Sequence, residues 1–208
     1  MWKDIPEKYG KYDTIRKRFA RWSKLGIFRV LFHFLVSKLK KHVVSMIDST
    51  TVKAHRTAAS LATDGQPREI GRSVGGLTTK IHLLATIEKM PVDFSLTGGQ
   101  VNDAKEGLSL ISKNICRIKA LLGDKAYDTD KIRQILARAK ADVCIPPKSN
   151  RKSQISYDEE LYKECSGIEN MFSKIKDWRG IAMRYCRCAH TFDSAVCLAL
   201  IMIFFNVR

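Results

Sequence analysis

Glu169 is a lone carboxylate on what the sequence predicts to be a partly buried helix over residues 162–176. At about 100° per residue, Tyr162, Cys165 and Lys176 fall on the same narrow sector as Glu169. A carboxylate between an aromatic ring and a lysine suits a metal site beside a nucleic-acid phosphate. An ordinary amphipathic helix with a charged solvent face would give the same local pattern, so the segment has to be judged with its neighbours. The apolar residues expected on the adjacent, core-facing sector are Ile168, Met171, Phe172 and Ile175.

Two aspartates end short apolar runs that have the character of buried strands. Asp48 closes the run 43–48, and Asp124 closes the run 118–124. In sheets covered by helices, chemistry collects at the carboxyl ends of the parallel strands, so the two carboxylates converge if these strands are neighbours. The helix that carries Glu169 can then bring in a third carboxylate. Asp is also common at strand ends because it caps turns and opens loops, which is the alternative interpretation of each residue alone.

Three carboxylates held close together repel one another and would partly protonate, and bound divalent cations remove this cost. Oxygen ligands without His or Cys favour Mg²⁺ or Mn²⁺ over Zn²⁺. Two Mg²⁺ ions about 3.5–4 Å apart can hold the attacking and leaving oxygens of a phosphoryl displacement. We therefore interpret Asp48, Asp124 and Glu169 as candidate catalytic and metal-binding residues. Four other acidic residues are interpreted as helix starts or solvated side chains, namely Asp103, Asp128, Asp130 and Glu164.

The elements that would position these side chains predict an α/β fold. Strands alternate with helices in the second half of the chain, and this order indicates a mixed five-stranded sheet flanked by helices. Helices are expected from residue 102 or 103 to 113, over 130–140, around Glu169 and across the apolar run 195–205, with a long loop over 58–76. The expected strands are 43–48, 79–86, 92–97, 118–124 and 142–145.

Residues 1–41 predict a small basic helical module ahead of a catalytic domain that spans 42–208. Apolar residues recur there at helical spacing, Gly26 is expected to end the first helix, and a second helix is expected over 27–40. The segment holds 12 Lys and Arg against 3 Asp and Glu, a net charge of +9. Its basic residues that we expect to contact DNA are Arg16, Lys17, Arg18 and Arg21.

The whole chain is strongly basic. Its 208 residues carry a formal charge of +16, and the pI is near 9.7. A field of that sign favours a polyanionic partner, of which nucleic acid is the commonest, although a basic surface that only maintains solubility has the same composition. Arg72 and Lys80 likewise could face DNA or could simply be solvated.

Cysteine usage and hydropathy indicate a cytoplasmic protein. Six cysteines are scattered through the chain without a preceding secretory signal, so reduced thiols are expected. The triplet Cys186, Cys188 and His190 is spaced too tightly for a usual zinc site and has no second pair nearby. No run reaches the roughly 18–20 apolar residues that cross a bilayer, so no membrane partner is expected.

At these residues the chain resembles bacterial insertion-sequence transposases of the DDE type, most closely the branch named after insertion sequence five. The similar blocks occur in the family's order and span essentially the whole chain, so together they are far more specific than any one of them. They are Met46–His55 around the first aspartate, Gly71–His82 in the following loop and strand, Gly123–Asp128 around the second aspartate, Ile168–Arg179 around the glutamate, and Arg184–Tyr185 with Arg187–Phe192 in the tail.

The resemblance implies an RNase H-like catalytic fold, two-metal chemistry with Mg²⁺ or Mn²⁺, and a place at the bacterial nucleoid. It implies binding to double-stranded DNA, both at the inverted repeats that end a mobile element and at the target. Asp48, Asp124 and Glu169 would then be the metal-binding catalytic triad. Tyr162 and Lys176 match the family's tyrosine and lysine around the glutamate, which touch DNA near the cleavage site. Pairing two element ends is expected to require a homo-oligomer.

Two departures from the family pattern keep other interpretations open. The family has an arginine three residues after the tyrosine, and this chain has Cys165, whose thiol cannot fork onto a phosphate as a guanidinium can. Family members also usually carry more residues before the segment that begins at Trp2, so a truncated DNA-binding region is expected. The alternatives to a transposase that cleaves element ends and transfers the 3′-hydroxyl strand are an inactive DNA-binding remnant and a general RNase H-like nuclease.

Overall fold

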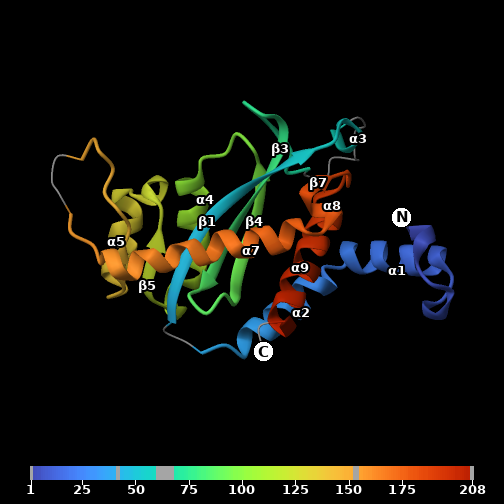
Figure 1. Cartoon of the computed structure of the whole chain (residues 1–208), viewed down its shortest axis with the longest axis horizontal. Helices are drawn as coiled ribbons and strands as arrows, with labels where there is room; N and C mark the ends of the chain where they lie inside the picture. Colours follow the sequence, from blue (N-terminus) through green and yellow to red (C-terminus); the bar gives the residue numbers. More distant parts are fainter. Residues whose placement is uncertain (1, 41–42, 60–67, 152–154, 207–208) are drawn as a thin grey trace.

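The computed structural model describes residues 2–40, 43–59, 68–151 and 155–206, with a mixed β-sheet at its centre (Figure 1). Five of its strands run side by side in the order β4, β3, β1, β5, β6. β3 is antiparallel to both β4 and β1, whereas β1, β5 and β6 are parallel to one another. The bounds of these strands are Val43–Ala54 for β1, Gly76–Thr86 for β3, Pro91–Gly98 for β4, Ile118–Gly123 for β5 and Asp142–Cys144 for β6.

Two short strands extend this sheet. β2 (Gly71–Ser73) pairs with the start of β3, and β7 (Met183–Arg184) pairs with the end of β1. The predicted mixed sheet flanked by helices is confirmed and is consistent with an RNase H-like fold. The predicted number of five strands is wrong, because the described part of the chain forms seven. β2 and β7 are too short to show an alternation of apolar and polar residues. They become strands because the long strands β3 and β1 offer backbone groups to pair with.

The stretch 58–76, expected as one long loop, contains β2 and the first residue of β3. Residues 60–67 of that stretch lie outside the described residues. The prediction failed here because β2 is specified by its partner β3 rather than by its own composition.

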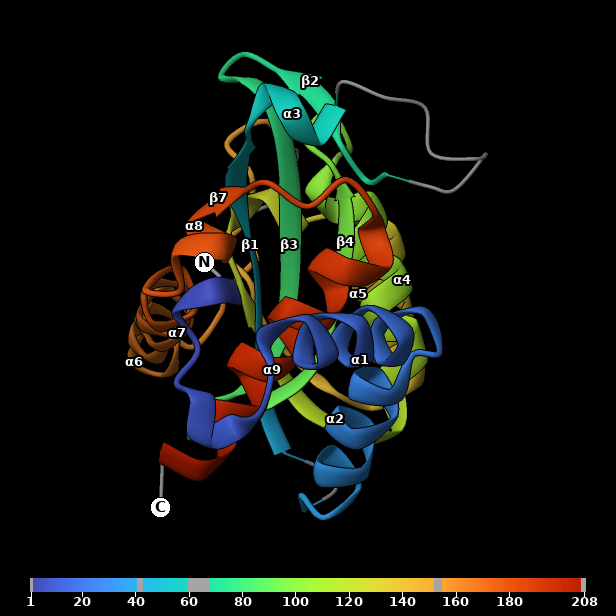
Figure 2. The same cartoon turned by 90° about the vertical axis from the view of Figure 1, so that its right-hand side faces the viewer.

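Helices cover both faces of the sheet (Figure 2). α4 and α5 lie on one side, and α7 lies on the other. The longer helices are α1 Tyr12–Lys24, α2 Ile27–Ser37, α4 Asp103–Asn114, α5 Asp130–Arg138, α7 Ser166–Lys176 and α9 Ala189–Asn206. The shorter ones are α3 Arg56–Ala59, α6 Glu159–Tyr162 and α8 Arg179–Ala182, with 3₁₀ turns at Trp2–Asp4, Glu7–Tyr9, Ile115–Arg117, Lys125–Tyr127 and Lys163–Cys165.

Local sequence explains where several of these helices begin. The Asn102 side chain accepts hydrogen bonds from two backbone N–H groups in the first turn of α4, as predicted for a cap at this position. The Thr129 hydroxyl accepts one from the first turn of α5. Gly26, between α1 and α2, has φ of 69°, a left-handed conformation that favours glycine. The predicted break between two N-terminal helices at Gly26 is therefore confirmed.

The N-terminal helices are joined to the sheet through α2. The Phe32 ring of α2 lies 5.8 Å from the Phe94 ring of β4 and 6.3 Å from the Phe204 ring of α9, measured between centroids. One continuous hydrophobic core therefore includes α2, the sheet and α9. The division into a DNA-binding module over 1–41 and a catalytic domain over 42–208 stays a prediction.

The terminal apolar run forms a core helix, as predicted, although α9 starts at Ala189 rather than near residue 195. Phe192, Val196 and Leu200 are fully buried on it. Among the described residues, no helix combines the length and the apolarity that crossing a bilayer requires.

Candidate active site

Asp48 and Asp124 directly follow the last residues that pair β1 with β5. Asp124 follows the end of β5, as predicted, but the predicted strand end at Asp48 is wrong, because β1 continues to Ala54 and Asp48 pairs with Leu83 of β3. Ile47 of β1 pairs with Gly123 of β5, and each aspartate is the next residue along its chain. Neighbouring strands lie about 4.8 Å apart, so this register brings the two aspartates together at one point of the sheet. Gly123 eases the close approach, because a Cβ there would lie 3.1 Å from Cγ2 of Ile47 and Ile47 would have to shift by a few tenths of an ångström. The predicted convergence of the two aspartates is seen in the structure.

Both aspartates also organise the backbone around them. Oδ1 of Asp48 accepts a hydrogen bond of 2.7 Å from the backbone N–H of Ser49. Oδ1 of Asp124 accepts one of 2.9 Å from the backbone N–H of Ala126 and so caps the 3₁₀ turn Lys125–Tyr127. The capping role and a role in a site are compatible here, because each carboxylate keeps a second oxygen for a ligand.

Glu169 reaches the same place from α7. The residues predicted to face the core are buried beneath α7, and Glu169 itself is exposed. The helix is not continuous over 162–176, since α6 ends at Tyr162 and a 3₁₀ turn separates it from α7. The shared face survives this break, because Tyr162, Cys165 and Glu169 all line one pocket of about 390 Å³ together with Asp48 and Asp124.

Two further residues line this pocket, Lys163 and Ser166, and sequence reasoning did not single them out. Ser166 lies four residues after Tyr162, a spacing that places both on one helix face. That spacing was the signal that could have found Ser166. Lys163 carries no such signal, because it lies outside the predicted sector.

Lys176, the fourth residue of the predicted sector, does not line the pocket. Its Nζ donates a hydrogen bond of 2.6 Å to Oγ1 of Thr50 and ties the end of α7 to β1. Lys176 lies seven residues after Glu169, about 10 Å along the helix axis. The two residues therefore share a helix face without lining the same pocket.

The charges of the three carboxylates act on one another. Burial, together with the negative charges of Asp124, Glu169 and Asp103, raises the pKa of Asp48 to about 6 against the opposing hydrogen bond from Ser49. This is the response expected where like charges share a partly desolvated site. A compensating positive charge in the pocket would therefore stabilise the ionised form of Asp48.

The pKa values of Cys165 and Tyr162, two neutral but titratable side chains of the pocket, are also raised. Burial, followed by the charges of Asp48 and Asp124, raises the pKa of the Cys165 thiol to about 12. Burial also raises the pKa of the Tyr162 hydroxyl, with smaller contributions from Cys165 and Asp124. Cys165 thus remains a neutral thiol at physiological pH and adds neither a positive nor a negative charge to the pocket.

The residues present fit a divalent cation by their chemistry. Asp48, Asp124 and Glu169 offer carboxylate oxygens, the ligands that Mg²⁺ and Mn²⁺ prefer. Within the described part of the chain, no three acidic, His or Cys side chains already stand at ligand distances around one point. The carboxylates therefore have to move toward one another around an ion, and their mutual repulsion opposes that movement until the ion is present.

A polar cluster lies on the opposite face of the sheet, immediately after Asp48. Oδ1 of Asp103 accepts hydrogen bonds of 2.8 Å from the Ser49 hydroxyl and 2.9 Å from Nζ of Lys80. Lys80 also donates to the carbonyl oxygen of Val101 at 2.9 Å. The ammonium group of Lys80 is thus already engaged by the protein, and this geometry does not favour its predicted contact with DNA.

The other basic residues predicted to contact DNA lie far from the carboxylates. Arg72 is exposed on β2 and pairs with Leu77 of β3. Leu77 lies six residues before Leu83, the residue of β3 that pairs with Asp48, so Arg72 lies about 20 Å from Asp48 along the strand direction. On α1, Arg16 and Lys17 are exposed and both pair with Asp13 at 2.7 Å. The remaining two are Arg18, whose guanidinium lies 5.9 Å from the Trp22 ring, and Arg21, which is exposed.

Asp128 corrects one interpretation made from sequence. It is only 3% exposed, whereas a helix start or solvated side chain was expected. Its carboxylate accepts from Nε of Arg133 at 2.7 Å, Nε of Arg151 at 2.6 Å and the backbone N–H of Lys148 at 2.8 Å. Asp128 therefore fastens the loop after β6 to α5. No local pattern predicts this, because two of the three partners lie 20 or more residues away. Asp103 and Asp130 do begin α4 and α5, as expected.

The family model described as the transposase DDE domain matches residues 39–205 of this chain. The chain belongs to the DDE transposase family. The match covers all three residues that we interpreted as the triad, and it supports the expectation of a bacterial insertion-sequence transposase. The assignment to the insertion-sequence-five branch stays a prediction.

Curated relatives agree with this membership. A Brucella ovis protein named as a predicted transposase for insertion sequence element IS6501 is 34% identical over 128 residues, 61% of this chain and 98% of that protein. An uncharacterized Sinorhizobium fredii protein, y4sN, is 36% identical over 58 residues, 28% of this chain and 46% of that protein. The DDE transposase described here thus spans nearly all of the first relative and about half of the second.

Among solved structures, one similar chain comes from the cryo-EM structure of a simian T-cell lymphotropic virus intasome in complex with the PP2A regulatory subunit B56 gamma. The TM-score is 0.37 at 13% identity, over 78% of this transposase and 48% of that chain. A similarity at this level is too low to support an inference about fold or activity.

Proposed function

We propose that this transposase cleaves DNA at the ends of an insertion sequence and transfers the freed 3′-hydroxyl strand into target DNA. The observation that supports this proposal best is that Asp48, Asp124 and Glu169 line a single pocket, although they come from two strands and a helix that are far apart in sequence. Membership of the DDE transposase family supports the reaction class.

In this proposal the three carboxylates hold Mg²⁺ or Mn²⁺, which when bound would neutralise charge on the attacking and leaving oxygens of a phosphodiester. Because the pKa of Asp48 is raised to about 6, its carboxylate is fully available as a ligand only above that pH. Tyr162 lines the pocket beside the carboxylates and is positioned to contact the DNA strand end through its ring or its hydroxyl. Water and the 3′-hydroxyl are the attacking groups, so no covalent protein–DNA intermediate is needed.

Binding of DNA would draw on charge outside the pocket. The formal charge of +16 favours association with the phosphate backbone. Arg18, Arg21 and Arg72 are exposed and carry no ion pair within the described residues, so they are the predicted DNA contacts that the structure leaves most available. Joining two element ends would require at least two copies of the chain, and the proposed place of action is the nucleoid.

The test is a nicking assay with Mg²⁺ on a duplex that carries the DNA flanking this gene. Asp124→Asn is expected to abolish nicking and to leave binding to that duplex largely intact. Asp142→Asn makes the same charge change at an exposed position outside the pocket and should nick normally. Equal nicking by wild type and Asp124→Asn would remove Asp124 from the triad. If the wild-type protein cleaved a random duplex as readily as the duplex with the flanking DNA, a general nuclease would be favoured instead.

Cys165 favours a second candidate function, a DNA-binding remnant that does not cut. The thiol lines the pocket at the position where the family pattern places an arginine. If the missing guanidinium limits activity, Cys165→Arg should raise nicking, since a charge-assisted hydrogen bond to phosphate contributes roughly 1–3 kcal/mol, or about 5- to 150-fold in rate. Absence of nicking in both proteins, with binding retained, would support the remnant.

A further inference from the structure

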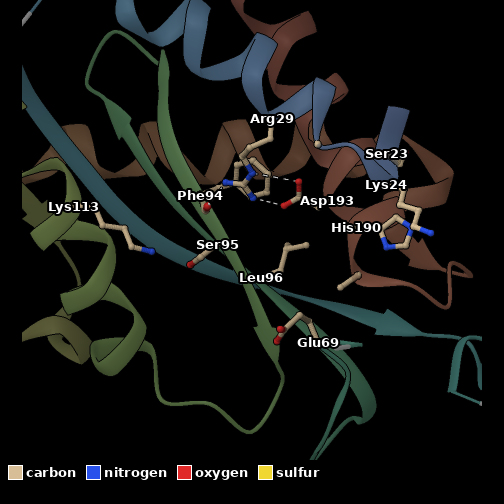
Figure 3. A pocket seen from close by; sticks show the side chains of 12 residues that line it. Ser23, Lys24, Arg29, Glu69, Phe94, Ser95, Leu96, Lys113, His190 and Asp193 are labelled. Carbon is tan, nitrogen blue, oxygen red and sulfur yellow. Dashed lines mark hydrogen bonds and ion pairs between the residues drawn. The ribbon is translucent and has the colours of Figure 1, made fainter. Parts of the chain in front are cut away.

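A second pocket, of about 590 Å³, lies at the open edge of β4 (Figure 3). In the described part of the chain β4 pairs with β3 alone, so its other edge faces this space. The pocket is bounded by the end of α1, the start of α2, α4 and the start of α9. It shares no lining residue with the carboxylate pocket.

Two hydroxyl groups in the wall of this pocket lack a partner. Ser23, on the last turn of α1, is only 2% exposed, and its Oγ has no hydrogen-bond partner among the described residues. Oγ of Ser95, on β4, is also covered and unpartnered among these residues, although Ser95 as a whole is only half-buried. Leaving a buried hydroxyl unsatisfied costs about 1–3 kcal/mol, so each would be stabilised by a polar ligand once its side chain rotates toward the pocket, because neither Oγ is open to solvent in this conformation.

Two ammonium groups, unpaired in the described part of the chain, flank the same space. Lys113 reaches the pocket from α4, while Lys24 and His190 approach from the opposite side (Figure 3). Lys24 and Lys113 take part in no ion pair within the described residues, and both are exposed at the rim. Their charges are therefore available to an anion, and they would fix it from two directions.

The acidic groups of the pocket oppose an anion only weakly. The carboxylate of Asp193 is neutralised by Arg29, whose guanidinium also donates to the carbonyl oxygen of Phe94 at 3.0 Å. Glu69 forms no ion pair in the described structure, so its carboxylate is the acidic group that opposes an anion, and burial raises its pKa. The net charge facing the pocket is thus positive.

Two helix N-termini meet at this pocket as well. Gly26, the N-cap of α2, and Ala189, the first residue of α9, both line it. The free N–H groups and the positive dipole end of each helix favour a bound anion. Together with the unpartnered hydroxyl of Ser23 and the two lysines, they form a set of donors that exceeds the one carboxylate of the pocket left unpaired among the described residues, Glu69.

We propose that this second pocket binds a phosphate group. A tetrahedral, multiply accepting anion satisfies hydroxyl, ammonium and backbone N–H donors at once, and the volume suits a ligand as large as a nucleotide. The phosphate could belong to a DNA backbone or to a free phosphomonoester, and the chemistry of recognition is the same for both. This proposal stands on its own residues and does not rest on the proposed cleavage activity.

The first test is lysine acylation of the full chain, read by mass spectrometry with inorganic phosphate, a mononucleotide or a short duplex without element ends. At a probe concentration about ten times Kd, acylation of Lys24 and Lys113 is expected to slow about tenfold. Lys119, exposed on β5 outside the pocket, should react at an unchanged rate. Protection by duplex alone assigns the site to backbone phosphates, and protection by the small probes assigns it to phosphomonoesters. Protection by none of them, or equal protection of Lys119, overturns the proposal.

The second test compares two double variants of equal charge. Lys24→Gln with Lys113→Gln should weaken binding of the protecting probe at least about tenfold in calorimetry, as loss of two charge-assisted contacts would. The matched pair Lys119→Gln with Lys131→Gln, both at exposed positions, should bind like wild type. Ser23→Ala should weaken binding without removing charge. Equal weakening in the control pair would show non-specific charge and would also overturn the proposal.

Discussion

Nζ of Lys176 donates a hydrogen bond of 2.6 Å to Oγ1 of Thr50, and this contact joins the end of the Glu169 helix to the strand that carries Asp48. Thr50 is two residues beyond Asp48 on β1. The bond therefore fixes α7 relative to β1 close to the pocket, and it gives Lys176 a positioning role whether or not it also contacts DNA.

Lys176→Met should lower the free energy of unfolding by about 1–2 kcal/mol, the range for a hydrogen bond that involves a charged group at a partly exposed site. Urea unfolding measures this, and Lys174→Met, an exposed lysine on the same helix, is the control. A double-mutant cycle with Thr50→Val should show coupling between the two positions. Additive effects of the two changes would show that the bond contributes nothing.

The raised pKa of Asp48 predicts a pH-dependent effect of Asp48→Asn on the metal-free protein. A carboxyl group whose folded pKa lies above its ordinary value of about 3.9 favours the fold below that value, and this contribution is lost as pH rises through about 6. Asn imitates the neutral form at every pH. With chelator present, Asp48→Asn should raise Tm by a few degrees at pH 8 and by little at pH 4.5.

Thermal unfolding of wild type, Asp48→Asn and Asp142→Asn at both pH values checks this. A rise of Tm in Asp142→Asn as large as in Asp48→Asn would trace the effect to net charge instead.

In the wild-type protein, Mg²⁺ affinity should fall as pH drops through about 6, because the proton on Asp48 competes with the ion. Calorimetric titrations at pH 5 and pH 8 would measure the difference.

Gly107 of α4 is predicted to tolerate no side chain. A Cβ at this position would lie 2.5 Å from Cε1 of Tyr127, a fully buried ring beneath the site. Gly107→Ala should therefore destabilise the protein by about 1–3 kcal/mol through overpacking. Gly180 in α8 is the matched control, since nothing lies within 4 Å of its Cβ position, and Gly180→Ala should be neutral or slightly stabilising. Urea unfolding of both variants decides whether Tyr127 is held this tightly.

Asp128→Asn should destabilise the protein by about 3 kcal/mol, the lower end of the range for breaking a buried ion pair, because its arginine partners are partly exposed. These arginines and the backbone N–H of Lys148 hold the pKa of Asp128 well below its usual range. Its contribution is thus fully present above about pH 4 and is lost only in strong acid. Asp130→Asn breaks an exposed pair with Arg151 and should cost less than about 1 kcal/mol. Similar losses in both variants would contradict the structural role of Asp128.

The sequence by itself determined the elements that carry the site. Short apolar runs ending in Asp48 and Asp124, and a helical spacing around Glu169, are local patterns set by burial of one face, so they can be read without a structure. The N-cap at Asn102 and the helix break at Gly26 can also be read from the sequence, because each depends on backbone groups within one helical turn.

Only the tertiary structure decided which of these residues meet. The pairing of Ile47 with Gly123 sets the two aspartates side by side, and strand register is fixed by contacts between distant segments. Lys80, Lys176 and Asp128 looked like solvent or DNA-facing charges, and each is held by partners from other elements. Packing of the folded chain creates the long-range strand pairing, the two-residue strand β7 and the pocket at the edge of β4. No single segment of the sequence encodes this packing.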